Sequence, residues 1–461
     1  MPPRYRLTRD ADAVKDAVAV PPLHGVAASR IARDMNAETP IRGGHLLAGG
    51  KRGRAGTGLV ARVVAGGFGR VLDRIDAGLD HGQLLATLPD GSRRLFGNRA
   101  AGPEAEIEIT SWNALLRLAT GGSTGWYQAW EAGEWDSPDP VPLFALFMRN
   151  AATLGGVARA KGPWRWLLRR IHLVQRNTRE GAQKNIAAHY DLGNDFYQAW
   201  LGATMVYSSG LFAVDPGQPS SLSQFFDPLD RAQSNKCGEV ARRLDDLAIE
   251  RILEIGCGWG TLAAHLSDRF AAPVDAISLS DEQLAFARAK FAKPSLDFHR
   301  QDYRDVAGGY DAIVSIEMVE AVGREYWPSF FDCLDRCLAP AGRAVIQYIS
   351  IRDELFDAYA ASADFIQTYI FPGGMLIRES EFRRLAAARG LAWRDQLDFG
   401  LDYAETLALW RENFDAAVEA RELPAGFDAH FVSLWRYYLM YCEGGFRGGG
   451  IEVSIVTLTR E

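Results

Sequence analysis

Apolar and polar residues follow two different patterns along this chain, and the second pattern is the more regular. From about residue 185 onward, short apolar runs typical of buried strands alternate with longer stretches of helical spacing. Such alternation with short turns predicts an α/β fold, in which helices cover both faces of a mostly parallel sheet. The predicted strands are 251–255, 273–278, 296–299, 311–316, 342–349, 391–398 and 451–459, and the predicted helices are 229–247, 259–270, 281–291, 325–337, 402–421 and 427–441, with a mostly helical stretch at 352–386.

The first part of the chain predicts a smaller α+β domain. Two short segments, 84–88 and 94–96, flank a Pro-Asp-Gly sequence at 89–91 that is typical of a hairpin turn. Residues 106–110 alternate as a half-exposed strand, and a helix is expected over 111–118. The predicted organisation is a weakly ordered segment at 1–67, a small domain at 68–155, a basic amphipathic linker helix at 156–186 and the larger α/β domain at 187–461.

Two features of this first part each have two interpretations. Trp126, Tyr127, Trp130 and Trp135 form an aromatic cluster that is either the core of the small domain or a lipid-facing surface. The stretch 161–184 holds seven Lys or Arg residues against one acid, with apolar residues at helical spacing. It is typical of a helix on a membrane surface, and equally of a linker helix that packs on the next domain.

Composition and charge restrict the class of protein. The net charge is −7, so no global basic surface points to nucleic acid as a partner. The five cysteines form no C-x-x-C pair, which favours free thiols in a reducing, cytoplasmic setting and gives no metal site. No apolar run reaches the roughly 18 residues needed to span a bilayer. We therefore expect a globular protein whose contact with a membrane is local and peripheral.

The strongest chemical signal is the stretch 251–266, RILEIGCGWGTLAAHL. A buried strand runs through Gly256, Gly258 and Gly260 into a helix, so a ligand can approach the backbone and the free N–H groups of the helix start. The G-x-G-x-G spacing differs from the dinucleotide fingerprint. Glu254, just before the first glycine, favours a ligand with a positive charge, and S-adenosylmethionine has an ammonium and a sulfonium group. The alternative is an ordinary strand–turn–helix.

Polar side chains also follow the next three predicted strands. In a parallel sheet the carboxyl ends of the strands lie at one edge, where ligands bind. Hydroxyl and amide groups after the second strand suit a ribose, and an aromatic ring and a carboxylate after the third suit an adenine. Each group taken singly is as common in a helix cap. The candidates are Ser278, Ser280 and Gln283, then Gln301, Asp302 and Tyr303, and finally Ser315.

Several stretches together resemble the cyclopropane-fatty-acid synthase family of S-adenosylmethionine-dependent methyltransferases. The resemblance implies a class I methyltransferase domain and a small lipid-binding domain. It also implies methyl transfer to the cis double bond of acyl chains in membrane phospholipids, by a peripheral enzyme at the inner face of the membrane. It adds Tyr207 and Ser208 to the expected cofactor site and leaves a homodimer open. The matching stretches are 188–195, 205–208, 253–260, 301–305, 369–374 and 437–446.

The same resemblance implies a catalytic set. In the family a bound bicarbonate is thought to act as the base that removes a proton so that a cyclopropane ring closes. Four of its ligands fall on Glu320, Ile349, Tyr403 and Cys442, while Gln347 stands where the family has histidine. An amide still donates an N–H but carries no charge.

Further departures leave the product open. Ser209 and Ala321 stand where the family often has cysteine and histidine. The product is a cyclopropane ring or, alternatively, a methylene- or methyl-branched chain. Two competing hypotheses are methylation of a soluble small molecule and a non-catalytic lipid-binding protein that keeps the fold. The favoured hypothesis, methylation of an acyl chain, requires a sheltered apolar passage beside the glycine turn.

Overall fold

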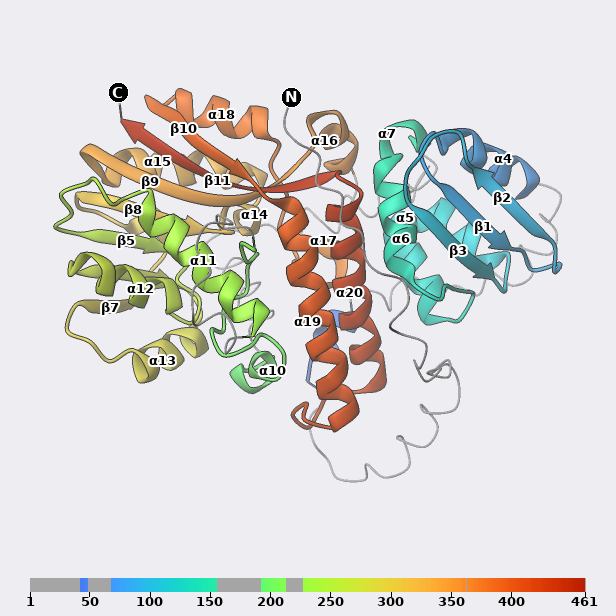
Figure 1. Ribbon diagram of the computed structural model, residues 1–461, viewed down its shortest axis with the longest axis horizontal. Helices are drawn as coiled ribbons and strands as arrows, with labels where there is room; N and C mark the ends of the chain where they lie inside the picture. The colour runs from blue at the N-terminus through green and yellow to red at the C-terminus, as the bar shows by residue number, and fades with distance from the viewer. Residues whose placement is uncertain (1–41, 49–67, 156–191, 213–226, 362, 461) are drawn as a thin grey trace, which may run out of the picture. The chain divides into compact units, whose positions relative to one another are not determined.

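The computed structural model describes residues 42–48, 68–155, 192–212, 227–361 and 363–460. The basic stretch 161–184 and most of the segment 1–67 lie outside these ranges, so their predicted roles stay predictions. The described residues contain two separate sheets, one of four strands and one of seven (Figure 1).

The four-stranded sheet forms as the hairpin signal predicts. Its strand order is β2-β1-β3-β4, with β1 antiparallel to β2 and parallel to β3. The predicted hairpin around 89–91 is therefore confirmed. Alternate residues of β3 are buried and exposed, which matches a sheet with one covered face. The strands are β1 (Gln83–Thr87), β2 (Arg93–Gly97), β3 (Glu104–Ile109) and β4 (Trp135–Asp136).

The helix expected over 111–118 is longer than predicted. It continues as α5 (Asn113–Glu131), with one non-helical residue at Gly122 (φ 59°, ψ −141°) where two helical pieces meet. Glycine adopts this backbone without a Cβ clash, so the helix resumes rather than ends. The second piece carries most of the aromatic cluster. Its interpretation as core is confirmed, because all four rings are at most 9% exposed.

The seven-stranded sheet has the order β10-β11-β9-β8-β5-β6-β7. The five strands from β5 to β9 run parallel, and β11 and β10 pair antiparallel at one edge. The predicted mostly parallel α/β sheet is thus confirmed. The strands are β5 (Ile252–Ile255), β6 (Val274–Ser278), β7 (Leu296–Arg300), β8 (Tyr310–Ile316), β9 (Leu338–Ile351), β10 (Leu391–Asp398) and β11 (Ile451–Arg460).

Helices cover this sheet, and α19 and α20 lie side by side beyond it (Figure 1). Most boundaries fall within a few residues of the predicted ones. The helices are α2 (Gly44–Ala48), α4 (Phe68–Gly78), α6 (Pro140–Arg149), α7 (Ala151–Leu154), α10 (Asn194–Gln198), α11 (Pro228–Arg242), α12 (Thr261–Phe270), α13 (Asp281–Lys290), η3 (Tyr303–Asp305), α14 (Val319–Val322), η4 (Arg324–Tyr326), α15 (Trp327–Cys337), α16 (Asp353–Tyr359), α17 (Phe365–Tyr369), α18 (Glu379–Ala387), α19 (Gly400–Ala420) and α20 (Ala429–Arg447).

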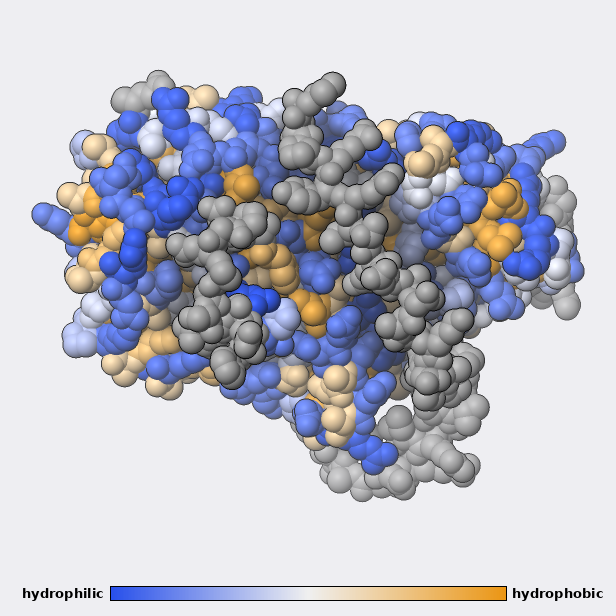
Figure 2. All heavy atoms as spheres, in the orientation of Figure 1, coloured by the Kyte–Doolittle hydropathy of each residue, from blue (hydrophilic) through white to orange (hydrophobic). Residues whose placement is uncertain are grey.

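Aromatic rings join the small sheet's helices to those of the larger sheet. Tyr127 of α5 contacts Phe365, Tyr369 and Tyr437, with ring centroids 4.9–5.1 Å apart. Gln128 donates to the Tyr369 hydroxyl at 3.1 Å. Hydrophilic residues predominate on the face seen in Figure 2. Within the described ranges, no helix combines the length and apolar character needed to cross a bilayer.

Candidate functional site: two adjoining cavities at the end of the parallel strands

The glycine turn after β5 has the backbone that the sequence predicts. Gly256, Gly258 and Gly260 all have positive φ, of 85°, 51° and 87°. A Cβ at Gly256 would lie 2.4 Å from Met318 Cγ, whereas one at Gly258 would meet open space. The Trp259 indole donates to Asn194 Oδ1 at 2.7 Å, which ties the turn to α10. The turn is therefore held in place and leaves room for a ligand at Gly258.

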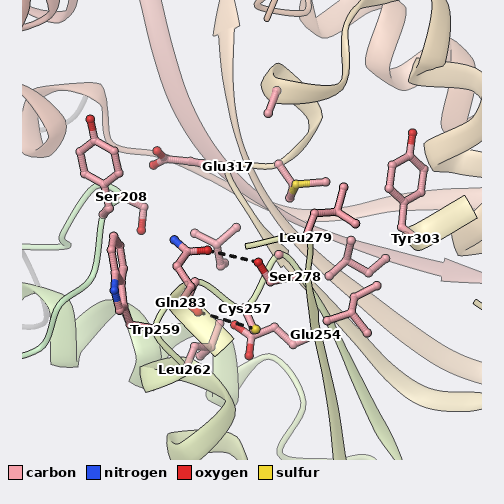
Figure 3. A pocket seen from close by; sticks show the side chains of 18 of the residues that line it. Ser208, Glu254, Cys257, Trp259, Leu262, Ser278, Leu279, Gln283, Tyr303 and Glu317 are labelled. Carbon is pink, nitrogen blue, oxygen red and sulfur yellow. Dashed lines mark hydrogen bonds between the residues drawn. The ribbon is translucent and has the colours of Figure 1, made fainter. Parts of the chain in front are cut away.

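A cavity of about 180 Å³ opens beside this turn, and we name it the glycine-turn cavity. Figure 3 shows the hydrogen bond from Ser278 Oγ to Gln283 Oε1, of 3.2 Å, in the middle of the lining. Trp259 lies on one side of this pair and Tyr303 on the other. Ten of the predicted cofactor residues line the cavity: Tyr207, Ser208, Glu254, Gly256, Gly258, Ser278, Gln283, Gln301, Asp302 and Tyr303.

Glu254 gives this cavity its chemical character. Its side chain is buried, and among the described residues its Oε2 atom has no hydrogen-bond partner. Burial raises the pKa of Glu254 to about 8, although the Ala263 backbone and the Lys236 ammonium favour the ionised form. A buried acceptor without a donor is costly, so this atom fits a ligand that brings a cationic N–H group. The residues present thus fit S-adenosylmethionine.

Three predicted cofactor residues do not line the cavity. A Cβ at Gly260 would meet Phe298 and Ala287 at 2.9 Å, so this glycine allows α12 to pack closely. Ser280 caps α13 by accepting from the Gln283 backbone N–H. Ser315 is fully buried and donates to the Ile255 carbonyl at 3.0 Å. For Ser280 the capping alternative is the one observed.

Asp302 lies in a different environment from the one that the sequence predicts. Its carboxylate pairs with Arg304 Nη2 at 2.6 Å and accepts the Arg304 backbone N–H at 2.9 Å. Tyr303 packs edge-on against Phe330 with centroids 5.9 Å apart. Both residues line the glycine-turn cavity, and the adenine of a bound methyl donor would share Asp302 with Arg304.

A second, larger cavity of about 400 Å³ adjoins the first, and we name it the apolar cavity. Side chains from α5, α6 and α7 of the small domain line it, together with residues of β9, α19 and α20. Tyr207, Glu317 and Ala321 line both cavities. The sheltered apolar passage that the methylation hypothesis requires is therefore present, and it reaches the glycine-turn cavity.

The predicted catalytic residues gather around this junction. Glu320, Ile349, Tyr403 and Cys442 all line the apolar cavity. Glu320 accepts a hydrogen bond from the Ile349 backbone N–H through Oε1, and its buried Oε2 has no partner among the described residues. Gln347 does not line either cavity; it is fully buried on β9 beneath the junction. Burial raises the pKa of the Cys442 thiol, which keeps it neutral.

Two charged residues at the site were not among the predicted site residues. Glu317, the first residue after β8, lies at the junction, and Lys236 of α11 is 1% exposed and lines the glycine-turn cavity. Lys236 Nζ donates to Ser208 Oγ at 2.5 Å, and burial lowers its pKa. An acid directly after a parallel strand was the available signal for Glu317, since strand ends were already expected to hold the ligand.

The residues present do not fit the bicarbonate that the family resemblance implies. Gln347 Nε2 donates to Glu317 Oε1 at 2.7 Å, and Tyr403 donates to Glu317 Oε2 at 2.7 Å. The Ile349 N–H is bound to Glu320. Three of the donors expected to hold the anion are thus already engaged by two carboxyl groups. Burial and the neighbouring Glu317 raise the pKa of Glu320 to about 8, so repulsion of a further anion would come from the Glu317 carboxylate.

The fold and the comparisons with known proteins define the class. The seven-stranded sheet and its helices are those of a class I S-adenosylmethionine methyltransferase. A solved structure described as mycolic acid cyclopropane synthase CmaA1 complexed with SAH and CTAB aligns with a TM-score of 0.53 and 26% identity. The alignment covers 60% of this chain and 98% of the other.

The sequence comparisons give the family. A family model described as mycolic acid cyclopropane synthetase matches residues 177–456. Tuberculostearic acid methyltransferase UfaA1 of Mycobacterium tuberculosis is 36% identical, over 78% of this chain and 85% of its own length. Cyclopropane-fatty-acyl-phospholipid synthase of Escherichia coli is 28% identical, over 77% and 88%. The chain belongs to the mycolic acid cyclopropane synthetase family and is an S-adenosylmethionine-dependent methyltransferase.

Proposed function

We propose that this enzyme transfers a methyl group to the cis double bond of an unsaturated acyl chain in a membrane phospholipid and forms a cyclopropane ring. The observation that carries the proposal is the meeting of a polar cavity and an apolar cavity at Tyr207, Glu317 and Ala321. The polar cavity suits a charged methyl donor, and the apolar one suits a hydrocarbon acceptor. An isolated alkene is a poor nucleophile, so holding it in line and away from water supplies much of the rate.

The chain's own residues bind and orient the methyl donor. Glu254 receives its ammonium group, and Ser278 with Gln283 can bond the ribose hydroxyls. The donor supplies an activated methyl group on a sulfonium. The SAH complex of the solved relative supports this use of the fold.

Aromatic rings near the junction suit the charge that develops on the acyl chain. Tyr207, Phe371, Tyr403 and Tyr438 line the apolar cavity. The Tyr207 and Tyr438 hydroxyls lie 3.0 Å apart and are hydrogen-bonded to each other. Such rings stabilise a nearby cation through their electron-rich faces without bonding to it.

The position of the small domain supports the proposal that the substrate is a phospholipid. Its α5, α6 and α7 contribute to the apolar cavity, so an acyl chain would pass between the two sheets' helices on its way to the donor. The proposal includes a peripheral site of action at the inner face of the membrane. The basic stretch 161–184 that would favour anionic lipids lies outside the described residues.

A branched product is a second candidate. The relative at 36% identity is named for tuberculostearic acid, and Gln347 and Ala321 depart from the family pattern at the junction. The methyl transfer would be the same, and only the later proton loss would differ.

Expression in a bacterium that makes monounsaturated phospholipids, but has no such enzyme of its own, tests the proposal. We expect its acyl chains to gain one CH₂ unit each. NMR or fragmentation then distinguishes a ring from a methylene branch, which have the same mass. Unchanged lipids, from a protein that binds S-adenosylmethionine, would instead indicate methylation of a soluble molecule.

The raised pKa of Glu254 predicts how donor binding varies with pH. The carboxyl must lose its proton to hold an ammonium, so a pKa of about 8 weakens binding at lower pH. Raising the pH from about 6 to about 7 increases the ionised fraction about ninefold, and we expect Kd to fall by that factor. Binding is tightest near pH 8, above which the ligand's own ammonium loses its proton. Calorimetry with S-adenosylhomocysteine measures this, and a flat profile between pH 6 and 7 would contradict it.

A further inference from the structure

Glu317 lies where the two cavities meet, and its position is unusual. It is the first residue after β8 and lines both cavities, so its carboxyl faces the region where donor and acceptor would meet. Its backbone has φ 50°, in the left-handed region that non-glycine residues rarely adopt. Backbone strain of this kind persists where the surrounding structure holds a residue in place, and it occurs often at functional sites.

Three donors converge on this carboxyl. Its Oε1 atom accepts from the Ser209 backbone N–H at 3.0 Å and from Gln347 Nε2 at 2.7 Å. Its Oε2 atom accepts from the Tyr403 hydroxyl at 2.7 Å. Burial raises the pKa of Glu317, whereas these three donors and the buried Lys236 ammonium favour its ionised form. The contacts therefore orient the carboxyl and partly offset the effect of burial by favouring its ionised form.

The contacts also explain one departure from the family pattern, at Gln347, and one expected role that Tyr403 does not fill. Gln347, in place of histidine, donates through an amide that does not titrate near neutral pH, so it can position the Glu317 carboxylate but cannot act as an acid or base. Tyr403, expected to bind bicarbonate, is a donor to Glu317 instead. Two of the groups that would hold an external anion therefore hold an anion that belongs to the chain.

We infer that Glu317 is the catalytic base of this enzyme and takes the place of bicarbonate, an inference that rests on the proposed function. The alkene π pair forms a C–C bond to the donor's methyl group, and the sulfonium becomes a thioether. A C–H bond of the new methyl group then breaks, its electron pair closes the ring, and the proton moves to a Glu317 oxygen. For a methyl branch with a new double bond, the proton instead leaves a chain carbon for the same oxygen.

Substitution of Glu317 tests this role. We expect Glu317→Gln to lower kcat by about 10²-fold or more, the usual contribution of a positioned base. Binding of S-adenosylhomocysteine should change by less than about threefold. The shorter Glu317→Ala leaves space for an anion, so added formate should restore part of its activity. Glu405→Gln, on the solvent side of α19, is the matched control and should keep full activity. A Glu317→Gln enzyme with wild-type kcat would overturn the inference.

Bicarbonate itself gives a second readout that does not depend on turnover. We expect no bound signal when ¹³C-bicarbonate is added to the wild-type protein, and a bound signal with Glu317→Ala. Activity of the wild type in solutions stripped of bicarbonate should stay within about twofold. Bound bicarbonate in the wild type, or activity that falls without it and returns with it, would overturn the inference. Absence of any lipid methylation by the wild type would contradict the proposed function, and the binding experiment would still decide the role of Glu317.

Discussion

Replacing Glu254 by glutamine weakens the binding of S-adenosylmethionine by about 30- to 1000-fold. The change removes the charge that pairs with the ligand's ammonium while the amide keeps the side chain's shape. Truncating one partner of a buried charged pair costs about 2–4 kcal/mol, which corresponds to this range of Kd. Calorimetric titration with S-adenosylhomocysteine, which has the same ammonium group, measures the loss.

The Glu254→Gln substitution should affect the stability of the ligand-free protein differently from the affinity for the ligand. Without ligand, the Glu254 carboxyl is buried with an unpartnered oxygen, and burial raises its pKa to about 8. A neutral amide at this position avoids the cost of burying a charge, so Tm should not fall. Glu250→Gln, an exposed glutamate just before β5, is the control and should leave Kd unchanged. A Glu254→Gln protein that binds the ligand as tightly as wild type would contradict the assignment of the glycine-turn cavity.

Replacing Gly121 by tryptophan fills the apolar cavity and lowers the rate of methylation of long acyl chains by about 100-fold or more. Gly121 of α5 lines the cavity, and a Cβ there would meet no atom within 4 Å. Its φ is not positive, so the backbone accepts a tryptophan side chain without strain. The indole would occupy the space that the acyl chain needs, and misplacement of a reactant by about 1 Å already costs about 10²-fold.

The control for this substitution separates a blocked cavity from a damaged fold. Gly121→Trp should bind S-adenosylhomocysteine as the wild type does, because the glycine-turn cavity is unchanged. Gly69→Trp, on the exposed face of α4 with open space around its Cβ, should keep full activity. Methylation of vesicles of monounsaturated phospholipid gives the rates. Equal rates for Gly121→Trp and wild type would show that the acceptor enters elsewhere.

The fold was predictable because its signals are local. The strand, glycine turn and helix at 251–266 depend on residues that are neighbours in sequence, and the alternation of strands and helices implied the parallel sheet. Ten of the thirteen predicted cofactor residues line one cavity because parallel strands end at one edge. Gly260, Ser280 and Ser315 lie at that edge but have other roles. The missing side chain of Gly260 lets α12 pack closely, Ser280 caps α13, and Ser315 donates to the Ile255 carbonyl.

The junction could not be predicted in the same way. Its contacts join residues far apart in the sequence, such as Tyr403 with Glu317, 86 positions apart, and Gln128 with Tyr369, 241 apart. Periodicity places Glu317 at the end of a strand but does not say which donors converge on it. The family resemblance supplied Tyr403 and Gln347 as residues at the site, and it assigned them to an external anion. The structure shows that both donate to Glu317 instead.

Incubation of the purified protein with vesicles of monounsaturated phospholipid and S-adenosylmethionine deuterated in its methyl group tests the central claim most directly. Mass spectrometry of the acyl chains shows whether the methyl carbon arrives on the lipid and how many deuterium atoms it keeps. The account predicts a labelled acyl chain that keeps two of the three deuterium atoms, because Glu317 takes the third as the ring closes. Lipids that gain no label from a protein that binds the methyl donor would contradict it.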